Sequence, residues 1–419
     1  MPTVYQAPGV YVEEAPPAAR PIAGVGTSTA AMIGVVSDNV KMPPLPDTTV
    51  DKDDANTPLK DEDEDKAKRL PLAPAGEPQL VTNWEEFKNS FGDLIPANKA
   101  LDHRVLAQAV YGFFNNGGTR CWVMRVAKNE NLDNLTEVLD KLEVIDEIAI
   151  VAVPGATKPT QQNAIIDHCD KMKDRVAILD GTPTPTALTS DAIRGKVEAN
   201  PPSQKEIAPT KESSHAALYF PWIKIFDAES NAIVVQPPSG HIAGVYARVD
   251  GTRGVVKAPA NEGIRGAIDL ERKLTSDHQQ GLNPDGINVI RTFNGNIKIW
   301  GARTLGGNSN QEFKYISTRR YFNFLRESID EGTQFAVFEP NTPALWQQIT
   351  RNVSDFLLGQ WRNGALFGEK PEQAFFVKCD AETNPADVRE QGQVVTEVGV
   401  AIAKPAEFVI FRIQQTTGG

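Results

Sequence analysis

The stretch "TSTAAMIGVVS", residues 27–37, is a continuous apolar run that ends at the turn-forming residues Ser37, Asp38 and Asn39. Such a run is typical of a strand buried on both faces, whereas a strand with one solvated face alternates apolar and polar residues. We therefore predict a central strand of a covered sheet here, and we expect the folded core to begin with it.

Downstream of this run, short apolar strands alternate with amphipathic helices. Strands are predicted at "CWVMRV" (121–126), "IAIVAVPG" (148–155), "VAILDG" (176–181) and "AALYFPWIKIFD" (216–227). Helices are predicted over residues 101–115, 132–142 and 159–173. This alternation is the βαβ pattern of a parallel sheet with helices on both faces. It predicts a mixed α/β fold, and we expect residues 130–285 to form an α/β domain of their own.

The last third of the chain carries further strong patterns. "INVIRTFNGNIKIWGARTL" (287–305) predicts two strands joined by an Asn294-Gly295 turn. Helices are predicted at 316–331 and 342–359, and strands at "TQFAVFEP" (333–340), "QAFFVKCD" (373–380), "VVTEVGVAIA" (394–403) and "AEFVIFRIQQ" (406–415). The chain is thus expected to end with an extended strand.

The chain also opens with an extended segment, "APGVYVEEAPPAARPIAGV" (7–25). Its expected strand consists of Val10, Tyr11, Val12 and Glu13. The prolines that follow forbid an immediate hairpin partner. Seven extended residues span about 23 Å, and the Pro-rich spacer adds about 25 Å. Two interpretations stay open: an edge strand docked on its own domain, or a strand donated to an exposed sheet edge of a neighbouring subunit.

The charge balance excludes one class of partner. The chain has 54 Asp and Glu against 43 Lys and Arg, a net charge of −11, and no basic cluster, whereas nucleic-acid binding depends on clustered Lys and Arg that neutralise phosphates. Residues 41–78 are Pro-rich and hold eight carboxylates between Asp51 and Asp65, which predicts a solvated insertion. We expect no nucleic-acid partner.

Cysteine use and the absence of targeting patterns bear on the compartment. Cys121, Cys169 and Cys379 are far apart in apolar or helical contexts, which predicts small buried thiols in a reducing compartment. No signal peptide and no apolar run of about 18 residues is found. We expect assembly in the bacterial cytoplasm and no direct membrane insertion.

No constellation of residues predicts catalysis or metal binding. His103 and His168 lie in expected helices and are assigned a surface or capping role. The acidic loop 51–62 fails the calcium-loop pattern at Ala55 and Asn56. The Gly-rich stretch 236–263 lacks a phosphate-binding motif and is interpreted as a tightly turning surface connection. We expect no catalytic, cofactor or metal residues, although a crevice at the strand ends leaves open an α/β enzyme or small-molecule-binding protein.

Several stretches, in order along the chain, closely resemble the contractile tail sheath proteins of bacteriophages and related injection particles. They are "PGVYVEE" (8–14), "RPIAGVGTSTAAMIGVV" (20–36), "FFNNGGTRCWVMRV" (113–126), "PPSGHIAGVYARVDGTRGVVKAPAN" (237–261), "IRTFNGNIKIWGARTL" (290–305) and "YISTRRYFNFLRESI" (315–329). These matches span most of the chain, with gaps at 41–78 and about 181–215.

The resemblance implies a structural subunit that stacks in hexameric rings around an inner tube, forming a helical lattice that contracts. It implies an inner domain built from both chain ends with an inserted outer domain. The expected ranges are an N-terminal arm 1–26, inner parts 27–129 and 286–405, the outer domain 130–285 and a C-terminal arm 406–419. Implied partners are further copies of the chain, the inner tube protein, baseplate and tail-terminator or cap proteins, and sibling sheath proteins. The particle is a phage virion tail or an extracellular injection particle after release.

The resemblance also assigns roles to particular residues. In the family, both terminal arms add strands to neighbouring subunits, which assigns that role to Val10–Glu13 and, at the other end, to Phe408, Val409, Ile410, Phe411, Arg412 and Ile413. A helix of the inner domain contacts the tube. The best candidate is "NTPALWQQITRNVSDFLLGQWRNG" (341–364), with Arg351 and Arg362 as tube-facing cations. Alternatively, Arg351 pairs with Asp355 one turn on.

Besides the sheath subunit and the α/β enzyme or small-molecule-binding protein, a non-contractile surface adhesin is a third interpretation of the chain.

Overall fold

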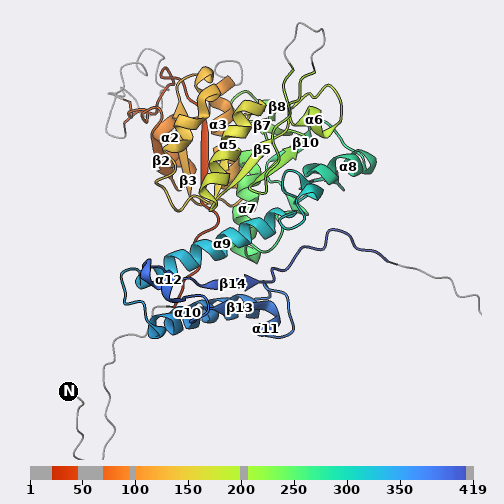
Figure 1. The fold of residues 1–419 in the computed structure, drawn as a ribbon. Coiled ribbons are helices and arrows are strands. Elements are labelled where there is room, and N and C mark those ends of the chain that lie inside the picture. The colour runs from red at the N-terminus through yellow and green to blue at the C-terminus, as the bar shows by residue number, and fades with distance from the viewer. Residues whose placement is uncertain (1–20, 46–68, 95–100, 199–205, 412–419) are drawn as a thin grey trace, which may run out of the picture. The chain divides into compact units, whose positions relative to one another are not determined.

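The computed structural model describes residues 21–45, 69–94, 101–198 and 206–411, and it is drawn in Figure 1. The chain divides into two compact units. Unit 1 comprises residues 21–24 and Glu327–Ile402, and unit 2 comprises Val25–Arg326 and the described residues from Ala403 onward. Three expected features lie outside the described residues: the strand Val10–Glu13, the pair Arg412 and Ile413, and most of the acidic insertion.

Unit 2 is built on a nine-stranded mixed sheet in the order β2-β3-β1-β4-β5-β6-β11-β12-β9. Its strands are β1 (Ala30–Val35), β2 (Pro78–Val81), β3 (Cys121–Val126), β4 (Ile150–Ala152), β5 (Val176–Asp180), β6 (Ala216–Phe220), β9 (Glu262–Gly263), β11 (Ile287–Phe293) and β12 (Asn296–Ile299). β1 is buried along its whole length and pairs in parallel with β3 and β4. The predictions of a central strand at 27–37 and of a mixed α/β fold are confirmed.

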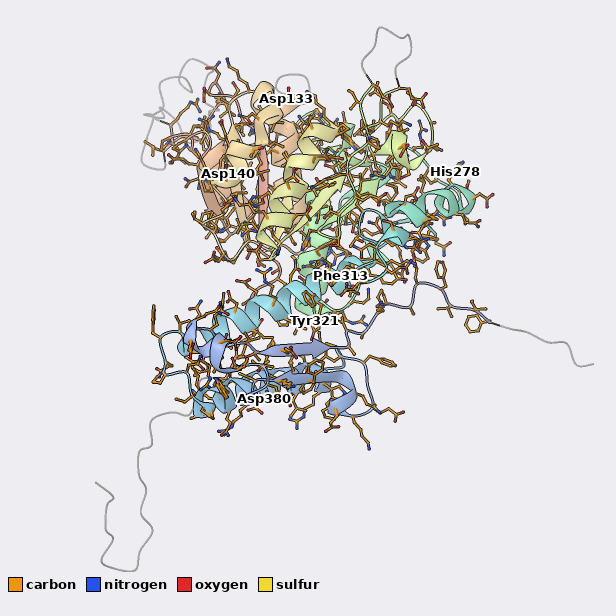
Figure 2. All side chains as sticks on the ribbon, in the orientation of Figure 1. Asp133, Asp140, His278, Phe313, Tyr321 and Asp380 are labelled. Atoms are coloured by element: carbon orange, nitrogen blue, oxygen red, sulfur yellow. The ribbon has the colours of Figure 1, made fainter. Side chains whose placement is uncertain are left out.

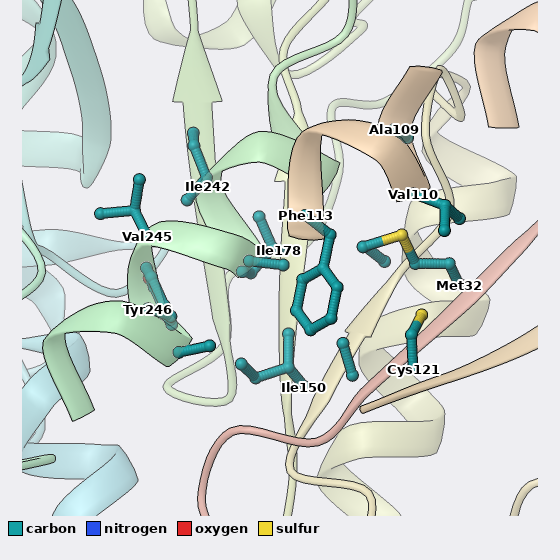
Figure 3. Packing of buried hydrophobic residues seen from close by; sticks show 14 of the residues in the cluster. Met32, Ala109, Val110, Phe113, Cys121, Ile150, Ile178, Ile242, Val245 and Tyr246 are labelled. Atoms are coloured by element: carbon teal, nitrogen blue, oxygen red, sulfur yellow. The ribbon is translucent and has the colours of Figure 1, made fainter. Parts of the chain in front are cut away.

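Helices cover both faces of this sheet. They are α2 (Trp84–Phe91), α3 (Leu101–Asn115), α4 (Leu135–Asp140), α5 (Pro159–Met172), α6 (Ser190–Ile193), α7 (Ser239–Arg253) and α8 (Ser276–Leu282), with short 3-10 turns η1 (Asn129–Asn134), η2 (Asn283–Asp285) and η3 (Gly307–Ser309). Successive side chains of β1 enter different cores, because neighbours along a strand point to opposite faces. Ala30 and Met32 pack with α2, α3 and α7, whereas Ala31 and Ile33 pack with α4 and α5. Figure 3 shows part of the first core.

The Gly-rich stretch 236–263 is not a surface connection, so that prediction is wrong. Most of it is the buried helix α7, which packs directly on α3. Gly240 and Gly244 lie one turn apart, and a Cβ on either would collide with the backbone of α3 at Ala109 and Phe113. The glycines therefore permit a close helix crossing, a role that their low helix propensity concealed in the sequence.

The predicted strand 216–227 is two strands. β6 ends at Phe220, and β7 (Ile223–Asp227) joins a separate antiparallel sheet in the order β10-β7-β8, with β8 (Ala232–Gln236) and β10 (Ala267–Leu270). Pro221 lies at the break, and proline has no backbone N–H to donate to a sheet ladder. The hairpin prediction at 287–305 is confirmed: β11 pairs with β12 across Asn294 and Gly295, which both have positive φ.

The expected domain boundaries differ from this division of the chain. The boundary at 129/130 would separate β1 and β3 from β4, yet β1 pairs with β4, and the boundary at 285/286 would separate β6 from β11, which also pair. Parallel strands that are far apart in sequence were assigned to different domains because sequence patterns do not reveal the sheet order. Which part of the chain faces an inner tube stays a prediction.

Unit 1 contains the end of α9 (Ile316–Thr333), η4 (Gln334–Ala336), α10 (Pro343–Arg362), α11 (Pro371–Ala374), β13 (Phe375–Lys378), α12 (Ala386–Glu390) and β14 (Glu397–Val400). The predicted strand at 333–340 is wrong, since η4 occupies its start. Of the predicted strand at 406–415, the described residues 406–411 belong to no strand, and the rest of it lies outside the described residues. Residues with a high strand propensity form a strand only where a sheet edge is available to pair with them. Among the described residues no such edge pairs with either segment.

Candidate assembly interface

The described part of the C-terminal arm is a run of exposed apolar side chains. Phe408, Val409, Ile410 and Phe411 are 70%, 70%, 79% and 83% exposed. Soluble proteins rarely leave four consecutive large apolar side chains in water, and a contiguous patch of this kind marks a surface that another chain covers. The segment has the composition of a strand, and in this chain it lacks a partner among the described residues.

The exposed run begins immediately after Glu407, which is fixed to unit 2. Arg303 donates from Nε to Oε1 at 2.8 Å and from Nη2 to Oε2 at 2.7 Å. Asn283 Nδ2 donates to Oε1 at 2.8 Å, and the Tyr315 hydroxyl donates to Oε2 at 2.9 Å. Tyr315 lies just before α9, between Phe313 and Tyr321 in the sequence, both labelled in Figure 2. Glu407 was not predicted, because its partners are far away in the sequence.

The electrostatics of this cluster favour the ionised carboxylate. Partial burial would raise the pKa of Glu407, but the hydrogen bonds from Arg303, Asn283 and Tyr315 outweigh burial, so its pKa is lowered. Burial and the hydrogen bond to Glu407 raise the pKa of Tyr315 to about 12. At neutral pH the Glu407 carboxylate is therefore ionised, accepts four hydrogen bonds and pairs with the buried guanidinium of Arg303.

The chain just before β1 is held by a second buried arginine. Arg320 of α9 donates to Asp250 of α7 at 2.9 and 2.5 Å, and both side chains are almost fully buried. Thr27 accepts from Arg320 through its carbonyl oxygen and donates from Oγ1 to Asp250 at 2.7 Å. The guanidinium also lies 4.7 Å from the ring centre of Tyr246. This network fixes where the chain enters β1.

The two-stranded sheet of unit 1 has an open outer edge. β13 and β14 pair antiparallel with Phe376 opposite Gly399, and Ala401 N donates to the carbonyl oxygen of Ala374. Because a ladder alternates, the backbone groups of Val398 and Val400 then point away from β13. Within the described residues no strand lies along that edge. An open edge of a two-stranded sheet is a template for a further strand.

Helix α10 matches its prediction closely. Pro343 begins the helix, and Leu345, Ile349, Val353 and Phe356 form its buried stripe. Arg351 and Arg362 are both exposed. In the described chain Arg351 forms no ion pair with Asp355 within 4.0 Å. Both guanidinium groups are thus placed at the surface, and their contact with a tube stays a prediction.

The histidines and cysteines have structural positions. His103 and His168 lie in helices as expected, but they are buried, so the surface role is wrong: His103 Nε2 contacts the carbonyl oxygen of Asp93 at 2.9 Å, and burial beside Arg175 lowers the pKa of His168 to about 4. Cys121, Cys169 and Cys379 are all buried and form no disulfide. Among the described residues no three His, Cys, Asp or Glu side chains could hold a metal ion.

The carboxyl end of the parallel sheet, where α/β enzymes bind ligands, carries a buried structural carboxylate. Asp180, the last residue of β5, accepts from the backbone N–H and Oγ of Ser239 at 2.8 and 2.7 Å, and from the N–H of Gly155 at 3.0 Å. Burial raises the pKa of Asp180 to about 6 despite these bonds. Its acceptor capacity is thus used to join β4, β5 and the start of α7.

Among the helices of the described residues, none combines the length and the apolar composition that a membrane-spanning helix requires.

Comparisons with known proteins agree on one family. Residues 127–305 match the phage tail sheath protein central domain, and residues 308–416 match the phage tail sheath C-terminal domain. The tail sheath protein of Burkholderia phage BcepMu is 26% identical over 213 residues, which cover 49% of this chain and 43% of that protein. The chain thus spans less than half the length of this curated relative.

Two solved structures match almost the whole chain. The helical sheath of the anti-feeding prophage in its contracted state is 28% identical, with a TM-score of 0.71, and the match covers 99% of this chain and 100% of that one. The sheath complex of the extracellular contractile injection system PVC, also contracted, is 27% identical with a TM-score of 0.70, and the match covers 99% of both chains. From these domain matches and the shared fold, the chain belongs to the phage tail sheath family.

Proposed function

We propose that this chain is the structural sheath subunit of a contractile injection machine. Copies stack as hexameric rings into a helical tube around an inner tube, and contraction drives that inner tube through a target envelope. The observation that carries the proposal is the exposed apolar run Phe408–Phe411, together with an edge of β14 that no strand of the described residues covers. A donated strand and an unfilled edge on every copy build an open, repeating lattice.

In this proposal both ends of the chain are donated strands. Val10, Tyr11, Val12 and Glu13 form the N-terminal strand, and residues 408–413 form the C-terminal strand. The outer edges of the β13–β14 sheet receive them, because each edge that no described strand covers can take one strand. Main-chain hydrogen bonds then hold neighbouring subunits together while the subunits change their orientation, and no catalysis or cofactor is required.

The inner tube contact is assigned to α10. Arg351 and Arg362 lie exposed on this helix and offer positive charge to an acidic partner surface. The inner parts of the sheath are then residues 27–129 and 286–405, and the region 130–285 is the outer domain. At the ends of the tube the partners are baseplate and terminator proteins, and the finished particle is a phage tail or an extracellular injection particle.

Negative-stain microscopy of the purified full chain tests the proposal directly. Striated hollow tubes are the expected result, and a chain lacking residues 1–20 is expected to remain a folded subunit that forms none. An α/β enzyme or binding protein would instead give dispersed particles whose melting temperature rises with a ligand. Normal tubes from the truncated chain would refute the donated N-terminal strand.

A further inference from the structure

We infer that Glu407 is a positioning residue that fixes the exit point of the C-terminal arm on its own subunit, so that residues 408–413 reach the neighbour from a defined origin. This inference rests on the proposed function, in which that arm pairs with another subunit. It concerns how the arm is held before pairing, which neither the exposed run nor the open edge explains.

The strongest observation is how selectively the segment is attached. Of the residues from Ala403 to Phe411, all of which are described, only Glu407 makes hydrogen bonds, and it makes four. The residues on either side of it are in no helix or strand, and Phe408–Phe411 are exposed. The segment is therefore attached at one point, and that point adjoins the apolar run.

Arg303, which binds Glu407, is also held by contacts that do not involve Glu407. Asn288, fully buried in β11, accepts from the backbone N–H of Arg303 at 2.7 Å and donates to its carbonyl oxygen at 2.8 Å. The Arg303 guanidinium is further held through Nη1, which donates to the carbonyl oxygen of Asn283 at 3.0 Å and to Asn308 Oδ1 at 3.1 Å. Its remaining donors form a planar fork that matches a carboxylate, which is the geometry of a specific two-point contact.

If the hydrogen bonds of Glu407, which we call the anchor, are lost, the free part of the arm begins in unit 1 instead of unit 2. The last ordered pairing before the arm is the bridge between Leu366 and Ile402, which belongs to unit 1, whereas Glu407 is bound to unit 2. Without the anchor, the flexible tether to Ile410 lengthens from three residues to eight. Tether volume grows with about the 3/2 power of length, so the local concentration of the strand falls about fourfold.

The test uses full-length Glu407→Ala and Glu407→Gln, with Lys404→Ala as the matched control in the same segment. Lys404 is exposed and forms no ion pair within 4.0 Å among the described residues. A nitroxide on Phe411→Cys reports arm mobility in unassembled subunits. Glu407→Ala is expected to increase nitroxide mobility and to raise the critical concentration for tube assembly about fourfold or more. Its melting temperature is expected to fall below the Lys404→Ala value, because the buried Arg303 guanidinium loses its carboxylate partner. Glu407→Gln keeps one acceptor and is expected to fall between.

Two comparisons keep the outcome interpretable. Tyr315→Phe removes one of the four hydrogen bonds and keeps the ion pair, so a small rise in critical concentration is expected even if the alanine variant folds poorly. Deletion of residues 408–419 tests arm donation itself. If that deletion abolishes tubes while Glu407→Ala assembles like the control, the anchor is refuted and arm donation stands. If the deletion assembles normally, the proposed role of the C-terminal arm is refuted.

Discussion

Gly244→Ala is expected to destabilise unit 2, whereas Gly251→Ala in the same helix is expected to stabilise it. A Cβ at Gly244 would collide with the backbone of α3 at Phe113, and a carbonyl group of a packed helix cannot rotate away. At Gly251 nothing lies within 4 Å of the new methyl group. The two substitutions are chemically identical, so their difference isolates the contact between α7 and α3.

The magnitudes follow from known substitution costs. Overpacking costs about 1–3 kcal/mol, and we take the upper end because the obstacle is backbone. Replacing a helical glycine by alanine contributes about 0.4–1 kcal/mol in the opposite direction. Gly244→Ala therefore loses about 2 kcal/mol net. For a unit of about 300 residues the unfolding entropy is about 0.6 kcal/mol per degree, which gives a melting temperature about 3 °C lower for Gly244→Ala and about 1 °C higher for Gly251→Ala.

Calorimetry of unassembled subunits at one pH and protein concentration measures both changes. Wild-type helix content by circular dichroism serves as the check that each variant is folded. A Gly244→Ala melting temperature equal to or above that of Gly251→Ala would show that the α7–α3 packing is absent in solution. The stretch 236–263 would then be the surface connection that its glycines suggest.

Four further predictions concern charge and pairing. Between pH 4 and 6 the folded state retains the proton of Asp180 while the unfolded chain has lost it, so the free energy of unfolding falls as pH rises through this window, and Asp180→Asn should flatten that fall in melting experiments. Arg320→Met leaves Asp250 buried and unpaired, so denaturant titration should show a loss of about 3–5 kcal/mol, and adding Asp250→Leu should restore part of it. Val398→Pro removes an outward N–H from the edge of β14 and should block tube assembly while the subunit still melts cooperatively; tubes from this variant would exclude that edge as an acceptor. Arg351→Glu should leave stability unchanged and weaken co-sedimentation with an acidic inner tube, most strongly at low salt.

Local sequence patterns alone predicted elements of both units. The buried strand β1, the hairpin at Asn294-Gly295 and helix α10 follow from local patterns that the tertiary structure reinforces. The glycines of α7 were misinterpreted because helix propensity opposes them, and only the position of α3 explains why Gly244 must be small. The strand order was not predictable, because parallel neighbours are chosen by packing between segments far apart in the chain.

The candidate interface was predictable in one part only. The composition of residues 406–415 showed a segment with strand propensity, which is a local property, and the structure added that Phe408–Phe411 are exposed. Glu407 was missed because a lone carboxylate before an apolar run carries no signal until folding brings Arg303, Asn283 and Tyr315 beside it.

The failed strand prediction at the C-terminus is itself informative about function. In most folded chains a segment's local preference agrees with its place in the fold, and disagreements concentrate where function requires them. Phe408–Phe411 prefer a strand, yet they pair with no edge among the described residues and stay exposed beside a carboxylate that accepts four hydrogen bonds. A terminal segment without a role would not be expected to follow directly after a residue that accepts four hydrogen bonds. A segment that belonged to a sheet of its own subunit would be expected to pair with that sheet. The combination of a fixed origin, an unsatisfied strand and an open edge at β14 is what a chain needs if its fold is completed only by another copy.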